Sequence, residues 1–390
     1  MSGFFLFNKQ IMLSLYFHIP FCNHKCFYCD FYSLGKFNKN QEDAFTESLL
    51  IEIDLSAKKY YKNQKIETIF FGGGTPSVLS VYNFNKIADK IKQSFDLSNL
   101  IEWTMEANPE SITKERLENY LQNGVNRLSI GAQSFNNDEL IFLERIHNSD
   151  EIKEKYYLSR ESGFENISLD LIFSLPKQSR ENWLNSLNSV FELDPEHISA
   201  YSLIFEEKTK LYNQFQKGLI LPNDPDFEHD LYIETIELME KNGLYQYEIS
   251  NYSKIGKECK HNLNYWYGTD YLSFGPSAHS FIENKRFWNY RSLKKYNELL
   301  SQKIIPEENF EIINTEMSLT EAIYLQLRSK GIFLEEFKAK FDIDLLNLVN
   351  MKLEYLFHKH LNVENNILRF TPEGYSISDE ITLKIMEVIE

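Results

Sequence analysis

The stretch YFHIPFCNHKCFYCDF, residues 16–31, decides how the rest of the chain is interpreted. It holds Cys22, Cys26 and Cys29, three of the four cysteines in 390 residues. An apolar run that Pro20 ends precedes them, so we expect the thiols on a loop that follows a strand. Three thiolates on one loop can hold three irons of a cubane cluster, although such clusters usually take four cysteines. The spacing therefore favours a 4Fe–4S cluster with one iron open to another ligand.

A zinc site is the alternative interpretation of this loop. Zinc would need four closed ligands, for example the three cysteines with His18 or His24. Zinc loops more often use two pairs of cysteines that are distant in sequence, and this chain has no second pair. A disulfide is disfavoured because the loop holds an odd number of cysteines and nothing marks the chain for secretion.

The C-x3-C-x2-C spacing, with Tyr28 directly before the last cysteine, resembles the radical S-adenosylmethionine (SAM) superfamily. The wider run YFHIPFC is similar to the branch that contains oxygen-independent coproporphyrinogen oxidases and HemW-type heme chaperones. The resemblance extends over nearly the whole chain. It implies that the amino and carboxylate groups of SAM chelate the open iron. It also implies one-electron cleavage of SAM to methionine and a 5′-deoxyadenosyl radical.

Length and charge narrow the class of protein. The length predicts one large domain and a smaller one, and the net charge of −16 argues against a general nucleic-acid binder. No apolar stretch is long enough to span a bilayer, and the apolar N-terminus lacks the features of a signal peptide. Met12 is an alternative start. Reduced thiols and a labile cluster predict a cytoplasmic location.

Short β-branched or aromatic runs alternate with helical patterns along the first 245 residues, which predicts an α/β fold with a parallel sheet and crossover helices. The expected strands are 13–19, 67–71, 101–107, 127–131, 167–172 and 197–203. The expected helices are 41–60, 78–94, 113–122, 149–162, 179–192 and 226–242. Six such units are too few for a full eight-unit barrel, and the resemblance implies a partial (β/α)6 TIM-like radical SAM barrel.

We expect three regions along the chain: the barrel in 1–245, a linking region with the heme-type motif in 246–310, and a winged-helix-like domain in 311–390. The last region combines helical patterns with a hairpin around the polar turn 364–366. It carries fourteen acidic and eight basic side chains, which disfavours DNA binding. A lid or docking role for this region is preferred.

Polar or glycine residues follow each expected strand, where parallel strands of a β/α barrel bring their chemistry together. The resemblance implies that these residues and their neighbours bind SAM: Tyr16, Tyr28, Gly73, Gly74, Thr75, Glu106, Gln133, Arg145, Asp170 and Ile204. For Glu106 and Asp170 a structural salt bridge, to Arg127 or Arg145, is the alternative. The run 72–76, GGGTP, lacks the Gly-Lys-Ser/Thr ending of a phosphate loop.

Three further features favour the heme-chaperone side of the branch. Phe31 stands where the oxidases carry an additional cysteine. The run HNLNYW, residues 261–266, matches a chaperone motif, and the runs LERIH at 143–147 and GPSAHS at 275–280 are similar to that side too. His261 can ligate heme iron with aromatic rings packed on the macrocycle. The alternative is an ordinary hydrogen-bonded turn. The remaining cysteine, Cys259, is expected to be a small buried residue.

The sequence thus favours a HemW-like heme chaperone that binds a 4Fe–4S cluster, SAM and heme. The alternative is an enzyme that decarboxylates coproporphyrinogen III. The expected partners are heme, heme-acceptor proteins and an electron donor such as a flavodoxin or ferredoxin, without nucleic acid. A peripheral membrane contact would suit heme delivery, but no basic amphipathic helix marks one.

Overall fold

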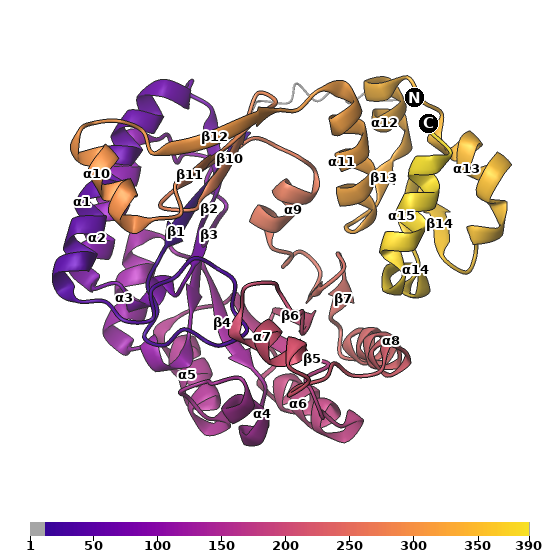
Figure 1. Cartoon of the computed structure of the whole chain (residues 1–390), viewed down its shortest axis with the longest axis horizontal. Coiled ribbons are helices and arrows are strands. Elements are labelled where there is room, and N and C mark those ends of the chain that lie inside the picture. The colour runs from indigo at the N-terminus through magenta and orange to yellow at the C-terminus, as the bar shows by residue number, and fades with distance from the viewer. Residues whose placement is uncertain (1–11, 390) are drawn as a thin grey trace. The chain divides into compact units, whose positions relative to one another are not determined.

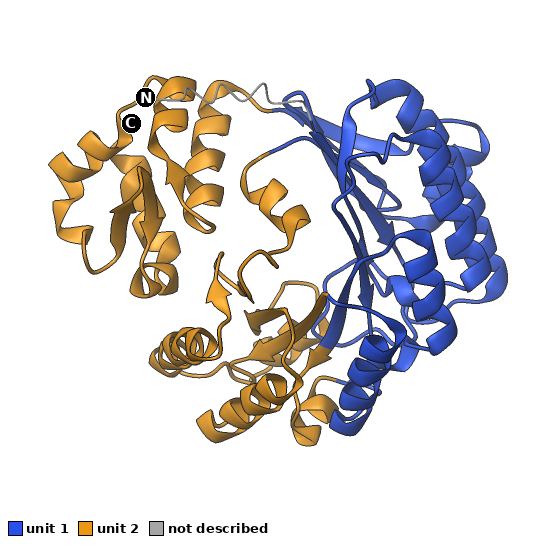
Figure 2. Cartoon of the chain, turned by 180° about the vertical axis from the view of Figure 1, so that it is seen from behind, with its two compact units in different colours: residues 1–131, 144–165, 269–312 blue, residues 132–143, 166–268, 313–390 orange. Residues whose placement is uncertain are grey.

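The structure is a computed structural model that describes residues 12–389. The chain forms two compact units, which Figure 2 colours separately. Unit 1 holds the residues up to 131 together with 144–165 and 269–312, and unit 2 holds 132–143, 166–268 and the residues from 313 onward. Each unit is described by itself.

Unit 1 is built on a mixed sheet with the strand order β12-β11-β10-β9-β1-β2-β3-β4 (Figure 1). The pairs from β9 through β1, β2 and β3 to β4 are parallel. The pairs from β9 through β10 and β11 to β12 are antiparallel. The strands are β1 (Met12–Ile19), β2 (Lys65–Gly73), β3 (Glu102–Ala107), β4 (Arg127–Gln133, whose last two residues belong to unit 2), β9 (Tyr271–Phe274), β10 (His279–Ile282), β11 (Lys285–Asn289) and β12 (Glu307–Ile312). The helices are α1 (Lys39–Tyr60), η1 (Pro76–Val78), α2 (Val81–Ser94), η2 (Pro109–Ser111), α3 (Lys114–Asn123), α5 (Ser149–Ser162) and α10 (Leu293–Ser301).

The central strand β1 is held by apolar packing on both sides. It lies between β2 and β9, and side chains on both of its faces are buried, as is typical of a parallel strand inside an α/β fold. Phe17 stacks on Phe71 of β2 and on Phe274 of β9, with ring centroids 4.7 Å away in each case. This packing fixes the end of β1, from which the cysteine loop begins.

Unit 2 combines a parallel strand pair with short antiparallel strands and a second, smaller sheet. Strands β5 (Ile167–Phe173) and β6 (His197–Ser202) are parallel, and β8 (Asn251–Ser253) and β7 (Tyr245–Gln246) extend them antiparallel. The small sheet has the order β13-β15-β14 (Ile332–Phe333, Ile367–Phe370, Leu361–Glu364). The helices are α4 (Asn137–Phe142), α6 (Arg180–Leu193), α7 (Lys210–Gln216), α8 (Pro225–Lys241), α9 (Lys260–Trp266), α11 (Thr315–Leu327), α12 (Leu334–Phe341), α13 (Leu345–Leu353), η3 (Glu354–Leu356), α14 (Pro372–Ser376) and α15 (Ser378–Glu387).

The six strands and six long helices expected over the first 245 residues are confirmed to within a few residues at each end. The hairpin around 364–366 is also present, as β14 and β15. The sequence did not predict α4 and α7, or the strands of residues 245–312, because short strands that pair with distant partners have little periodicity of their own. None of the helices within residues 12–389 has the length and apolarity that crossing a bilayer requires.

A fully buried carboxylate ties α1 to the later strands of unit 1. Glu52 accepts hydrogen bonds from the Tyr296 hydroxyl at 2.6 Å, from the Gly275 backbone N–H at 2.8 Å and from the Asn289 side-chain amide. Burial raises the pKa of Glu52 to about 7, although each of these three donors lowers it. The folded state therefore favours the neutral carboxyl over the charged one.

We expect this carboxyl to make stability depend on pH. Because its folded pKa is raised, its contribution is complete below the unfolded value near 4.5 and is lost as pH rises through about 7. Between pH 5 and pH 8 the wild-type free energy of unfolding should fall by roughly 1 to 3 kcal/mol more than that of Glu52→Gln. Urea unfolding at the two pH values measures this difference.

Glu47→Gln is the matched control, because Glu47 lies on the same helix and its side chain is 62% exposed. That variant should follow the wild-type pH dependence. Equal pH dependence in wild type and Glu52→Gln would contradict the assignment.

Candidate cluster and cofactor site

The three predicted cysteine ligands lie on one closed loop after β1. The loop is pinned at its base, where the Cys22 N–H donates to the Leu34 carbonyl at 3.0 Å and the Leu34 N–H donates to the Pro20 carbonyl at 2.8 Å. Within it, the Cys29 N–H donates to the Cys26 carbonyl at 3.2 Å. Backbone hydrogen bonds therefore hold all three thiols on one short segment, as the spacing predicted.

A chain of hydrogen bonds connects two of these thiols through the ends of β2, β3 and the segment after β4. The Thr75 hydroxyl donates to Cys22 Sγ at 3.5 Å, and the Asn108 amide donates to Thr75 Oγ1 at 3.0 Å. Arg145 donates to Asn108 Oδ1 at 2.6 Å and to Cys26 Sγ at 3.5 Å. We call these five residues the thiol ring. It joins residues that are up to 123 positions apart, from Cys22 to Arg145.

The donor set fits a cluster with negative charge. Burial raises the pKa of the Cys22 and Cys29 thiols, in the case of Cys29 to about 11, and neighbouring cysteines add to both shifts. Cluster binding requires thiolates, so it must release these protons. The guanidinium of Arg145 donates to Cys26 Sγ at 3.5 Å and so brings a positive charge to the donor set. In the described part of the chain, no three His, Cys, Asp or Glu side chains are already gathered around a metal position.

The glycine run after β2 packs against the start of the cysteine loop. Gly73 has a φ of +105°, and a Cβ there would lie 2.5 Å from Nδ1 of His18. A Cβ on Gly74 would lie 2.6 Å from the Phe21 carbonyl oxygen. Only glycine fits such positions without displacing its neighbours. The backbone of this run therefore approaches β1 closely, and its N–H groups stay near the loop: Gly74 donates to the Ile19 carbonyl at 2.8 Å.

Tyr16 and Glu106 lie near each other beside this glycine run. Burial raises the pKa of Tyr16 far above its usual value, and the Glu106 carboxylate adds to the shift. His18 donates through Nε2 to the Tyr32 carbonyl at 2.8 Å, and its Nδ1 lies 3.3 Å from the Tyr16 hydroxyl. Burial lowers the pKa of His18 to about 4, so this imidazole is neutral at pH 7. Tyr28 is half-buried near Arg145 and Cys26, and loss of water around its hydroxyl raises its pKa.

Four of the predicted residues belong to unit 2. Gln133 ends β4 with a φ of +69°, Asp170 is half-buried in β5, and Ile204 follows β6 with 65% of its side chain exposed. Ser168 donates to Asp170 Oδ1 at 3.1 Å. His261 lies on α9 and is fully buried, with its Nε2 2.8 Å from the Tyr265 hydroxyl. In this arrangement Nε2 already has a hydrogen-bond partner.

Sequence reasoning missed two residues of the site in unit 1. Asn108 bridges Thr75 and Arg145, and His18 fits between Gly73 and the Tyr32 carbonyl. The signal for Asn108 was available, because it directly follows the third expected strand and precedes Pro109. The position of His18 depends on its ring orientation, which strand periodicity does not predict.

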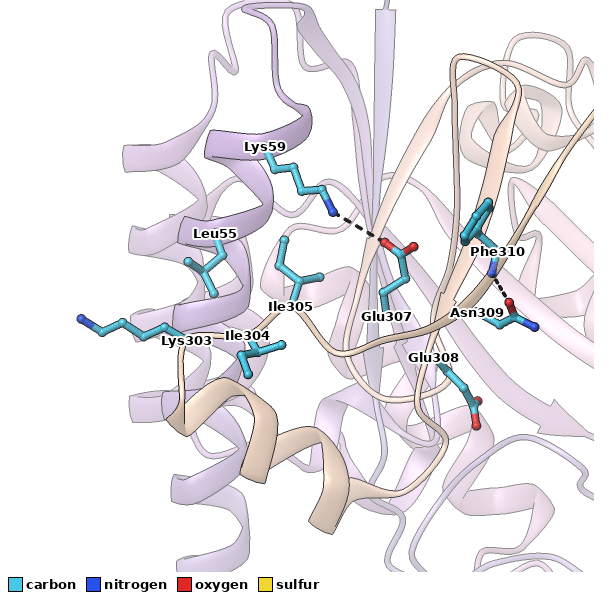
Figure 3. Close-up of a pocket in the computed structure, with 9 residues that line it drawn as sticks. All are labelled: Leu55, Lys59, Lys303, Ile304, Ile305, Glu307, Glu308, Asn309 and Phe310. Carbon is cyan, nitrogen blue, oxygen red and sulfur yellow. Dashed lines mark hydrogen bonds and ion pairs between the residues drawn. The ribbon is translucent and has the colours of Figure 1, made fainter.

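A surface pocket on unit 1 lies elsewhere. Leu55 and Lys59 of α1 line it together with residues 303–305 and 307–310, at the edge strand β12 (Figure 3). Lys59 Nζ lies 3.7 Å from a Glu307 carboxylate oxygen across the pocket. None of the predicted site residues lines it.

Comparison with known proteins identifies relatives of the chain. The family model of the radical SAM superfamily matches residues 16–190. The heme chaperone HemW of Bacillus subtilis is 39% identical over 379 residues, which cover 95% of this chain and 98% of that protein. HemW of Escherichia coli is 40% identical over 270 residues, or 69% of this chain and 70% of that protein.

A solved structure supports the predicted fold. The coproporphyrinogen III oxidase HemN of Escherichia coli, described as a radical SAM enzyme, superposes with a TM-score of 0.80 over 96% of this chain and 90% of its own. Because the two sequences are 22% identical, this structural likeness supports the fold alone. The expected radical SAM α/β fold is confirmed. With its cysteine loop, its matching family model and its full-length relatives, the chain belongs to the radical SAM superfamily and, within it, to the family of the HemW proteins.

Proposed function

We propose that this chain is a heme chaperone: it binds a 4Fe–4S cluster, SAM and heme, and passes heme to acceptor proteins. The observation that carries the proposal is the identity of 39% with a HemW protein over nearly the full length of both chains. The thiol ring supports the cluster part of it, because it brings a guanidinium and a hydroxyl to two of the three thiols. We further propose a cytoplasmic location and an electron donor of the flavodoxin or ferredoxin type.

Cys22, Cys26 and Cys29 would hold the cluster. A cluster with an open iron supplies one electron to a bound sulfonium. Arg145 would offset the negative charge of the thiolates, and its contacts to Asn108 and to the Gly131 carbonyl at 3.0 Å fix its direction. The close packing around Gly73 and Gly74 would exclude water from one side of the site.

Each unit, taken by itself, carries residues proposed to contact SAM. In unit 1 the proposed contacts are Tyr16, Tyr28, Gly73, Gly74, Thr75, Glu106 and Arg145. In unit 2 they are Gln133, Asp170 and Ile204. Carboxylates suit the amino and ribose hydroxyl groups of SAM, because both groups donate hydrogen bonds. A guanidinium suits its carboxylate.

Heme would bind at the motif of α9, with His261 as axial ligand. Because His261 is buried and its Nε2 lies 2.8 Å from the Tyr265 hydroxyl, ligation would require this hydrogen bond to open. The proposal therefore includes a local rearrangement of α9. Phe31, which is 68% exposed, stands where the oxidases carry a further cysteine. This difference favours the chaperone over the oxidase.

Removing a cluster thiol should remove the iron. Wild-type protein reconstituted without oxygen should contain about four irons per chain, whereas Cys29→Ser should lose most of the iron and of the visible absorbance of the cluster. Cys259→Ser is the matched control, because Cys259 is a fully buried cysteine of unit 2. Iron and sulfide analysis measures both. Full iron content in Cys29→Ser would exclude the proposed ligand set.

Arg145→Lys should weaken SAM binding and spare the cluster. Lysine cannot reproduce the two-directional contacts of the guanidinium, so we expect the SAM dissociation constant to rise about tenfold, or ~1.4 kcal/mol. Arg116→Lys is the control: Arg116 belongs to the same unit and donates to the Ser111 carbonyl at 2.9 Å. Isothermal titration with SAM compares the three proteins. Unchanged affinity in Arg145→Lys would remove Arg145 from the SAM contacts.

Incubation with coproporphyrinogen III, SAM and a reductant separates chaperone from oxidase. We expect no protoporphyrinogen, and a separate absorbance titration should give saturable uptake of heme. His261→Ala should lower heme affinity about tenfold, if one iron–imidazole bond contributes ~1.4 kcal/mol net, whereas His229→Ala, on an exposed position of α8, should not. Formation of protoporphyrinogen by the wild type would support the oxidase instead.

A further inference from the structure

A line of buried hydrogen bonds crosses unit 2 from β5 to the start of α9. Ser168 and Asp170 lie on one face of β5, and Ser168 pairs in register with His197 of β6. The distances are 3.1 Å from Ser168 Oγ to Asp170 Oδ1, 2.8 Å from Ser168 Oγ to His197 Nδ1, and 2.8 Å from His197 Nε2 to the Tyr247 hydroxyl. The Cys259 N–H donates to that hydroxyl at 3.2 Å. We call these five residues the polar line.

The direction of every hydrogen bond in the polar line follows from its acceptor end. The Ser168 hydroxyl has one hydrogen and gives it to Asp170, so it must accept from His197 Nδ1–H. Nε2 of the neutral ring is then an acceptor, which the Tyr247 hydroxyl satisfies. The Tyr247 oxygen in turn accepts from Cys259 N–H. All four bonds therefore point toward the Asp170 carboxylate, and His197 is held as its Nδ1–H tautomer.

The interior position of the polar line makes it sensitive to a change at either end. Ser168, His197 and Cys259 are fully buried, and Tyr247 is 6% exposed. Hydrogen bonds in such surroundings polarise one another, and a buried polar group that loses its partner destabilises the folded state. A change in the hydrogen bonding of Asp170 therefore alters the other hydrogen bonds of the polar line.

The far end of the polar line is the N-cap of α9. Cys259 is the N-cap residue, and its own side chain makes no capping hydrogen bond. The Cys259 N–H donates to the Tyr247 hydroxyl, and α9 itself carries His261 and Tyr265. Asp170, at the other end, is one of the proposed SAM contacts. The line thus joins the two positions at which the proposed function places its two small molecules in unit 2.

We propose that Tyr247 and His197 are positioning residues that couple ligand binding at Asp170 to ligand binding at α9. This inference rests on the proposed function, because it takes SAM as the ligand at Asp170 and heme as the ligand at α9. A ligand group that donates a hydrogen bond to Asp170 weakens the hydrogen bond that the carboxylate accepts from Ser168. Each further hydrogen bond of the polar line is then weakened in turn. Linkage requires that SAM and heme then change each other's affinity by the same factor.

The test is heme affinity with and without saturating SAM, using the full-length protein with its cluster oxidised and no reductant present. In the wild type we expect the two dissociation constants to differ about fivefold or more, which is the lower end of common coupling. Tyr247→Phe and Ser168→Ala each remove one oxygen of the polar line. In either variant the heme dissociation constants with and without SAM should differ by less than roughly twofold.

Tyr375→Phe is the matched control. Its hydroxyl donates to the Ser329 carbonyl at 2.6 Å in the same unit, outside the polar line. This variant should keep the wild-type ratio, which separates coupling from general loosening of unit 2. A wild-type ratio of one with both ligands bound, or an unchanged ratio in Tyr247→Phe, overturns the inference and leaves the proposed function standing. Absence of heme binding in the wild type overturns both.

A second measurement tests the inference without measuring ligand affinity. Nitrogen-15 NMR of labelled histidine distinguishes the two neutral tautomers, and His197→Phe identifies the signal. We expect His197 to be protonated at Nδ1 with Nε2 accepting a hydrogen bond, and this signal should shift when SAM is added. A ring protonated at Nε2 would break the polar line and overturn the coupling.

Discussion

The guanidinium of Arg145 connects the cysteine loop to β3 and β4 through hydrogen bonds. Arg145 reaches Cys26, the end of β3 at Asn108 and the Gly131 carbonyl of β4, so a single planar group with several donors joins three segments. Arginine suits this position because its donors are fixed in direction and it keeps its charge when buried. The loop would otherwise depend on its own few backbone hydrogen bonds.

Buried titratable groups occur in both units, and burial shifts the pKa of several of them toward the uncharged form. Burial keeps Glu52 neutral through the acidic range, while it keeps His18 uncharged at pH 7. In unit 2, Glu248 is fully buried and burial raises its pKa to about 7. Uncharged groups with complete hydrogen bonding cost less to bury than ions do. For Glu52, His18 and Glu248, burial therefore favours the uncharged side chain.

The sequence alone predicted the six strands, the long helices and the cysteine loop, because each has a local signal: apolar runs, helical periodicity, or cysteine spacing. It also predicted Thr75 and Arg145 as site residues, though only through the family resemblance. The thiol ring was beyond its reach, since Asn108 acquires its role from two partners 33 and 37 positions away. The polar line was equally hidden, because a serine on one strand and a histidine on the next meet only through their register.

The pocket of Figure 3 borders β12, which stands at the outer end of the strand order of unit 1. Such a strand offers unpaired backbone groups to any other chain, and here Phe310 and Ile312 are also more than half exposed. β12 also carries charged side chains that form ion pairs with β11: Glu307 with Lys285 at 2.6 Å, and Glu311 with Arg286 at 2.8 Å. Bringing a second strand alongside would strip water from these ions. Charged side chains on an edge strand are one device that disfavours pairing with another chain, and salt weakens interactions between exposed charges by screening them.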